Sequence, residues 1–184
     1  MNRISVILAA SLAALTLTAQ PAPERKTLSQ SMDRAFGQAE KEFVPAVEAL
    51  PEAKFGFVPT KGQFKGVRSF GAQAKHVAAV NYLLGAAILG EKPPAEVGEG
   101  DGPATMKTKA EVVAYVKGSY EYAHKALASL TDANALEPLK SPFGNGMTNR
   151  VELSNILLGH TFDHYGQIVV YLRMNGIVPP ASRK

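Results

Sequence analysis

Residues 149–175 read NRVELSNILLGHTFDHYGQIVVYLRMN and carry the strongest structural signal of the chain. Within them, apolar residues and histidines recur every three or four positions, which places their side chains on one face of a helix. This stripe consists of Leu153, Leu157, His160, His164, Ile168 and Tyr171. Gly176 follows, with Pro179 and Pro180 beyond it, a typical helix end. We therefore predict a helix from about Asn149 to Asn175 that buries two histidines one turn apart.

Three further segments show helical spacing, from about Thr27 to Leu50, Ser69 to Leu89 and Thr108 to Leu130. The first and third begin with capping-box sequences, and Gly90 suits the end of the second. Pro45 should kink the last turn of the first helix or end it early. The expected core residues are Leu28, Met32, Ala35, Ala39, Phe43, Ala46 and Leu50; Gln73, His76, Val80, Leu83 and Ala87; and Val112, Val116, Tyr120, Ala123, Leu127 and Leu130.

The remaining segments, 55–68, 91–106 and 131–148, contain Gly and Pro and are expected to be connections. No segment shows convincing strand alternation. Four amphipathic helices without strands or repeats predict an all-α fold, an antiparallel four-helix bundle in one domain. The long connections leave room for a crossover topology.

The N-terminus resembles an export signal. Residues 1–3 carry a positive charge, and residues 4–19 are uncharged but would span only about 24 Å as a helix, less than a bilayer core. We expect residues 1–19 to be a signal peptide and residues 20–184 the mature domain, so a periplasmic or secreted location is predicted. An uncleaved membrane anchor is the alternative.

Composition excludes several function classes. The chain has 184 residues, no cysteine and a net charge of +4 that is not gathered into Lys/Arg blocks. Nucleic-acid binding is therefore not expected. Without cysteine, a transition-metal site must use His, Asp or Glu side chains.

Three of the four histidines, His76, His160 and His164, occupy predicted core positions on two helices. Burying neutral imidazoles costs free energy unless the ring nitrogens find partners, and one metal ion would serve all three rings. We predict that these three residues bind a divalent metal; hydrogen-bonded core histidines are the alternative. Zinc fits this ligand set best, and nickel, iron or manganese are compatible. Three neutral ligands would leave open positions and a Lewis-acid centre.

Other polar residues near this stripe are given structural roles. His124 lies on a polar helix face, and we expect a surface histidine near Glu121. Asp163 should point away from the histidine face as a surface charge, with orientation of a ligand as the alternative. Gln167 could hold a metal-bound water or substrate, or hydrogen-bond within the core. Tyr171 is expected to pack, near enough to His164 to line a cavity.

Three motifs together resemble the DinB-like (damage-inducible) family: His76–Val80, His160–Gln167 and Tyr171–Pro180. The resemblance covers the chain from about Thr27 to Pro180. It implies an up-down-down-up four-helix bundle, a divalent metal on the same three histidines and a homodimer. Many members carry an Arg where this chain has Tyr165, so no role of that Arg is carried over.

Three functions remain open. The first is an exported metal-binding protein without an assigned activity. The second is a transferase or isomerase that activates a thiol, as the resemblance implies, although the family's low-molecular-weight thiols are cytoplasmic. The third is a metal-dependent hydrolase, for which no Glu or Asp on the histidine stripes offers a general base.

Overall fold

The computed structural model describes residues 25–62 and 65–184, so the predicted signal peptide lies outside the described residues. The predicted all-α four-helix bundle is confirmed, and each helix end lies within two residues of its expected position. The helices are α1 (Leu28–Ala49), α2 (Phe70–Leu89), α3 (Lys109–Ala128) and α4 (Arg150–Met174). None of these described helices is both long and apolar enough to cross a membrane.

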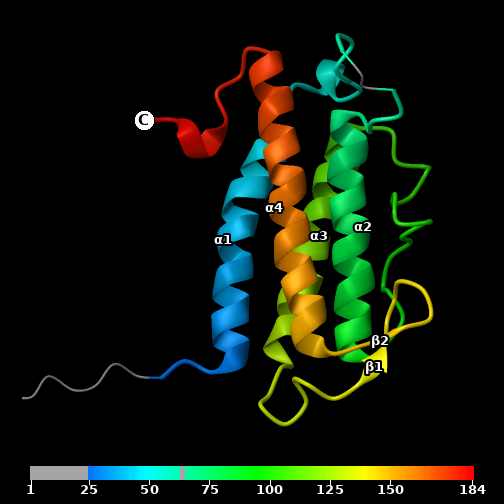
Figure 1. The fold of residues 1–184 in the computed structure, drawn as a ribbon. Coiled ribbons are helices and arrows are strands. Elements are labelled where there is room, and N and C mark those ends of the chain that lie inside the picture. Colours follow the sequence, from blue (N-terminus) through cyan, green and yellow to red (C-terminus); the bar gives the residue numbers. More distant parts are fainter. Residues whose placement is uncertain (1–24, 63–64) are drawn as a thin grey trace, which may run out of the picture.

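The helices follow an up-down-down-up course (Figure 1). α1 and α4 run in one direction, and α2 and α3 run in the other. Each helix packs against two neighbours, so that α2 lies between α3 and α4, and α1 contacts the same two helices from the opposite side. The connection from α2 to α3 must therefore return along the full length of the bundle, and it does so beside α2 (Figure 1).

Local capping explains why the helix ends were predictable. Thr27, Ser69, Thr108 and Asn149 each accept a hydrogen bond from the backbone amide three residues later, which satisfies one of the unpaired donors of the first turn. Gly90 ends α2 with a φ of 72°, a left-handed conformation that glycine adopts without strain.

α2 is the central helix, and the expectation of a single buried stripe was too narrow for it. Fourteen of its 20 residues are buried. Leu83 and Ala87, expected in the core, are half-buried, whereas Asn81 and Leu84 are fully buried. The reason is that α2 is covered by α3, by α4 and by apolar side chains of the connection that follows it.

Two details differ from the sequence analysis. Of the two alternatives for Pro45, an early end of the helix is contradicted, because α1 continues to Ala49. Ala46 and Val47 are buried in that last turn, and their packing outweighs the missing backbone donor. The α3–α4 connection also contains a short antiparallel hairpin of two-residue strands, β1 (Leu139–Lys140) and β2 (Met147–Thr148), too short to give an alternating pattern.

Arg150, the first residue of α4, fastens this connection to the bundle. Its guanidinium donates to the carbonyl of Ile88 at the end of α2 (3.0 Å) and to that of Asn134 (3.1 Å). The side chain is only 20% exposed, so these charged hydrogen bonds are largely shielded from water. Single-turn 3₁₀ helices occur at η1 (Glu52–Lys54) and η2 (Pro180–Ser182).

Candidate metal centre

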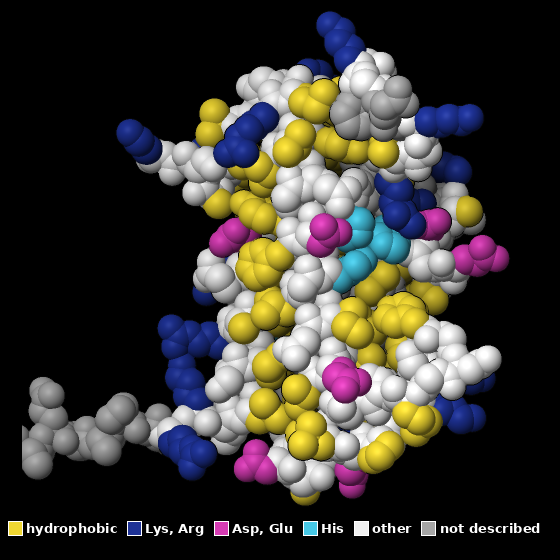
Figure 2. All heavy atoms as spheres, in the orientation of Figure 1, with side chains coloured by type: hydrophobic (Ala, Val, Ile, Leu, Met, Phe, Trp, Pro, Cys, Tyr) yellow, Lys and Arg dark blue, Asp and Glu magenta, His cyan; other side chains and the backbone are white. Residues whose placement is uncertain are grey.

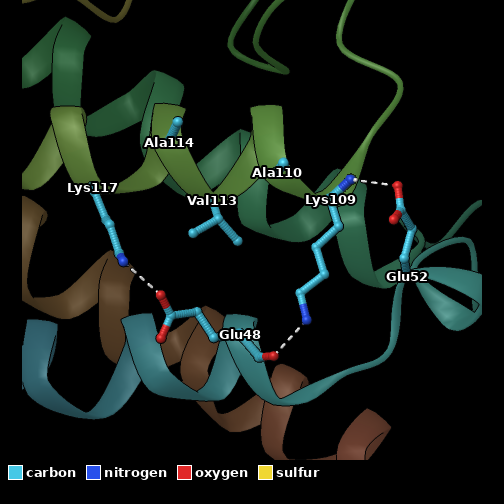
Figure 3. A pocket seen from close by; sticks show the side chains of 7 residues that line it. All are labelled: Glu48, Glu52, Lys109, Ala110, Val113, Ala114 and Lys117. Carbon is cyan, nitrogen blue, oxygen red and sulfur yellow. Dashed lines mark hydrogen bonds and ion pairs between the residues drawn. The ribbon is translucent and has the colours of Figure 1, made fainter.

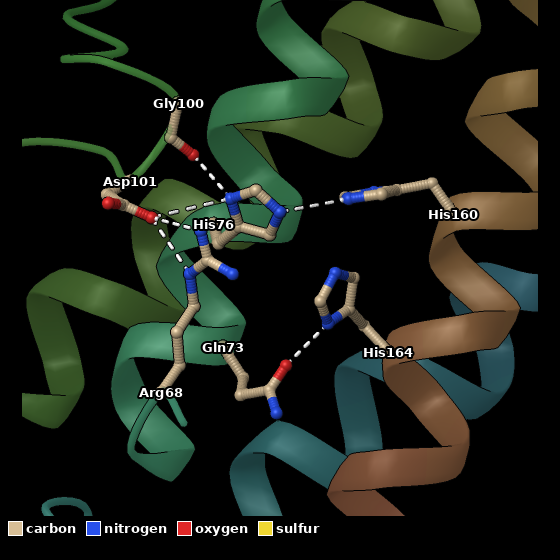
Figure 4. Close-up of polar contacts among 7 residues, drawn as sticks. All are labelled: Arg68, Gln73, His76, Gly100, Asp101, His160 and His164. Atoms are coloured by element: carbon tan, nitrogen blue, oxygen red, sulfur yellow. Dashed lines mark hydrogen bonds and ion pairs between the residues drawn. The ribbon is translucent and has the colours of Figure 1, made fainter. Parts of the chain in front are cut away.

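The structure brings His76, His160 and His164 together. His76 projects from α2, and the other two project from successive turns of α4, the antiparallel neighbour of α2 (Figure 4). One nitrogen from each ring lies within 4.8 Å of the nitrogens of the other two. The ring centroids are 4.5 to 4.9 Å apart. The helical spacing therefore predicted the convergence of the three rings, while their role as ligands remains a prediction.

The connection between α2 and α3 fixes the tautomer of His76. The Nδ1 atom lies 2.6 Å from the carbonyl oxygen of Gly100. Because a carbonyl can only accept, Nδ1 must carry the proton. The Nε2 lone pair of His76 is therefore available, and it faces His160 Nε2 at 3.1 Å (Figure 4).

A chain of side-chain amides fixes the tautomer of His164. Its Nδ1 atom donates to Gln73 Oε1 on α2. Gln73 Nε2 donates to Gln167 Oε1 (2.8 Å), and Gln167 Nε2 donates to Asp163 Oδ2 (3.3 Å). His164 Nε2 is thus left with a lone pair, and the ring turns this nitrogen towards the other two histidines (Figure 4). Gln167 thus hydrogen-bonds within the protein, one of its two predicted roles, and Asp163 is exposed as expected but also accepts from Gln167.

His160 has no comparable partner. Its Nδ1 atom is buried and makes no hydrogen bond to any described residue. Within residues 25–62 and 65–184, its Nε2 atom has a single polar contact, with the Nε2 atom of His76. In a tetrahedral site with metal–nitrogen bonds of about 2.0–2.1 Å, ligand nitrogens lie roughly 3.3 Å apart, close to the spacing of these two atoms. The spacing and the available lone pairs fit one shared divalent ion.

All three histidines are held in the neutral form that binds metal. Burial is the largest cause, and it lowers the pKa of all three rings. The pKa of His160 falls to about 3 and that of His164 to about 4, and the pKa of His76 is also lowered. Positive charge adds to this effect, because the rings repel one another when protonated and the Arg68 guanidinium acts on each of them.

The site reaches the molecular surface. Figure 2 shows histidine side chains on one open face of the molecule, with a Lys or Arg side chain directly beside them. The side chain of His76 is 15% exposed. No further His, Asp or Glu joins the cluster among the described residues, so an ion held by these three side chains would keep coordination positions for other ligands.

Sequence reasoning missed the groups that the connections bring to the site. The guanidinium of Arg68, just before α2, binds Asp101 Oδ1 through Nε (2.9 Å) and Nη2 (2.8 Å), and the same oxygen is 3.6 Å from His76 Nδ1. Tyr171 packs as expected, and its hydroxyl also donates to the carbonyl of Arg68 (3.2 Å). Connections lack periodicity, so no pattern marked Arg68, Gly100 or Asp101.

His124 stays outside the cluster, as expected, but its predicted surroundings were wrong. It lies between α3 and α1, where Nδ1 contacts Asp33 and Nε2 lies 3.1 Å from Glu40 Oε2, and it does not pair with Glu121. Burial opposes the charged form, but the hydrogen bonds and charges of the two carboxylates outweigh it and raise the pKa of His124. The pattern of α3 alone could not reveal carboxylates on α1.

A groove of about 510 Å³ lies elsewhere, between the end of α1 and the start of α3 (Figure 3). It has an apolar floor, and its rim is closed by the ion pair between Lys117 and Glu48 (2.6 Å) and by Lys109, which donates to the Glu48 carbonyl (2.6 Å). The groove shares no residue with the histidine site, and its charged side chains are paired either with each other or with backbone groups of the rim.

Comparison with known proteins agrees with the geometry. Residues 35–168 match the family model of the DinB superfamily. A solved structure of a DinB-like protein from Bacillus cereus ATCC 10987 superposes with a TM-score of 0.65 at 15% sequence identity, covering 81% of this chain and 93% of that one. At that identity the likeness shows the fold alone. No curated protein matched the chain.

Proposed function

Since the chain belongs to the DinB superfamily, we propose that it binds one divalent metal ion through His76, His160 and His164 and keeps that ion accessible to a small molecule. The observation that carries this proposal is the arrangement of the three rings. They converge as neutral imidazoles from two helices, and the tautomers of two of them are fixed so that Nε2 lone pairs meet.

Zinc is the proposed ion. Three imidazoles without thiolate or carboxylate form a donor set that suits zinc, and nickel, iron and manganese are the alternatives. The hydrogen bonds to Gly100 and Gln73 support a bound ion further, because partners of this kind orient metal-binding histidines and raise their basicity.

A divalent ion held here would supply Lewis acidity, which lowers the pKa of a bound thiol or water. The alternative function is a transferase or isomerase that activates a thiol. The thiol proton would pass to solvent at the exposed face, and the neutral ligand set suits an anionic sulfur ligand. Hydrolysis ranks third, because no Glu or Asp among the described residues joins the histidine cluster to serve as a general base.

The proposal includes export and self-association. The uncharged run of residues 4–19 supports a periplasmic or secreted protein. The outward face of α4 supports a homodimer, because it exposes large apolar residues. These are Ile156, Phe162, Val170 and Met174. A molar mass of one chain in light scattering across the micromolar range would contradict the dimer.

The test of the metal site is elemental analysis of protein purified without a histidine tag. We expect about one equivalent of a first-row metal in wild type and none in His160→Ala or His76→Ala. His124→Ala is the matched control, because it removes an imidazole outside the cluster. Equal metal content in His160→Ala and His124→Ala would overturn the ligand assignment.

A further inference from the structure

Arg68 places a cation at the edge of the histidine site. Its backbone is fixed by the Tyr171 hydroxyl, and its side chain lies beside His76 (Figure 4). Asp101 Oδ1 contacts both groups. It lies 2.9 Å from Arg68 Nε, 2.8 Å from Arg68 Nη2 and 3.6 Å from His76 Nδ1. The cation therefore stands within one side-chain length of the open metal positions.

Asp101 engages the guanidinium only in part. Both contacts from Arg68 reach the same carboxylate oxygen, so the pair lacks the two parallel hydrogen bonds of a bidentate ion pair. Arg68 Nη1 makes no hydrogen bond to the described residues. Asp101 is 66% exposed and Arg68 41% exposed, so their pairing is weakened by water. A competing carboxylate can replace this contact at little cost.

We propose that Arg68 is the anion-binding residue of the site and selects small molecules that carry a carboxylate close to their metal-binding atom. This inference rests on the proposed function, because it assigns the class of ligand that the open metal face accepts. The planar guanidinium matches a carboxylate, and the ligand's metal-binding atom would point towards His160 and His164. Asp101 forms an ion pair with the guanidinium while no such ligand is bound.

A purely structural role for Arg68 makes a different prediction. If Arg68 serves only to hold Asp101 and the α2–α3 connection near His76, its replacement should weaken every ligand equally through the metal. If it binds a ligand carboxylate, its replacement should weaken carboxylate ligands alone. Matched thiols with and without a carboxylate separate these two roles.

The experiment uses the full mature chain loaded with cobalt(II), whose visible absorption reports on ligand binding directly. Mercaptoacetate and 2-mercaptoethanol are titrated into wild type, Arg68→Gln and Arg68→Lys. The control is Arg173→Gln, which removes an exposed arginine of α4. We expect wild type and the control to bind mercaptoacetate about tenfold more tightly than 2-mercaptoethanol. Arg68→Gln should lose this preference, so that the ratio of its two affinities falls to about one whatever the change in 2-mercaptoethanol affinity itself.

Two variants strengthen the test. Arg68→Lys keeps the charge without the planar fork and should retain only part of the preference. Asp101→Asn removes the internal competitor and should tighten mercaptoacetate binding. An undiminished preference in Arg68→Gln, or none in wild type, would overturn the inference while leaving the metal site intact. Failure to bind cobalt, or to bind either thiol, would overturn the proposed function and this inference with it.

Discussion

Replacing Gln73 with Leu tests whether the amide chain prepares His164 for metal. Gln73 is only 2% exposed and makes two hydrogen bonds, accepting from His164 Nδ1 and donating to Gln167 Oε1. Leu has a similar volume but neither accepts nor donates. The variant therefore keeps the packing of α2 and removes the group that holds the His164 proton on Nδ1.

The magnitude follows from the burial of His164, which is 7% exposed. A buried donor left without its partner costs about 1–3 kcal/mol. Loss of a group that orients a metal-binding histidine typically weakens metal affinity by about 10–100-fold, which corresponds to roughly 1.4–2.8 kcal/mol. We expect a loss of zinc affinity in this range with the helical fold retained.

The assay is a competition titration of zinc against a chromophoric chelator, with circular dichroism to confirm folding. Gln38→Leu is the matched control, because Gln38 is exposed on α1 and bonds only to Glu42 among the described residues. Gln73→Glu should bind zinc at least as well as wild type, since a carboxylate also accepts from His164. Equal zinc affinity in wild type and Gln73→Leu would refute the idea that this amide orients the ligand.

Four further substitutions concern stability, each measured by urea denaturation. The raised pKa of His124 implies a stabilisation that is complete below pH 6.5 and is lost as the pH rises through the folded-state pKa. Wild type should thus lose stability relative to His124→Gln above pH 6.5, and parallel pH profiles would contradict this. Gly159→Ala should raise stability by about 1 kcal/mol, because its Cβ would meet nothing within 4 Å. Gly85→Ala should lower stability, because its Cβ would lie 2.9 Å from the Tyr122 ring; equal effects of the two glycine changes would refute this packing. Arg150→Ala should cost about 2–3 kcal/mol through its two charged hydrogen bonds to carbonyls, and an unchanged midpoint would contradict this role.

The fold was predictable because its signals are local. A capping residue and its partner lie three positions apart, and helical spacing is read within one segment. The stripe of α4 therefore placed His160 and His164 on one face, and the stripe of α2 placed His76 on another. Their convergence then followed from packing two buried faces together.

The rest of the site depends on tertiary structure. Gly100 and Asp101 reach His76 because the crossover passes beside α2, a path that no residue spacing encodes. Arg68 lies at the site because Tyr171 of α4 holds its backbone carbonyl by a hydrogen bond, a contact between segments far apart in the sequence. His124 was misread for the same reason, since its two carboxylate partners belong to a different helix. In each case the missing information was which segments lie side by side.

The burial of α2 determines when the site can be lost. Because α2 is covered on most of its surface, we expect its backbone amides to exchange with solvent only when the whole bundle opens. Frayed ends and the connections exchange through smaller openings. His76 and Gln73 lie on this helix, so an opening of the crossover can break the contacts of Gly100 and Asp101 while His76 and Gln73 stay in place. We therefore expect the α2 side of the histidine cluster to last as long as the native state, and its contacts with the crossover to be broken and remade more often.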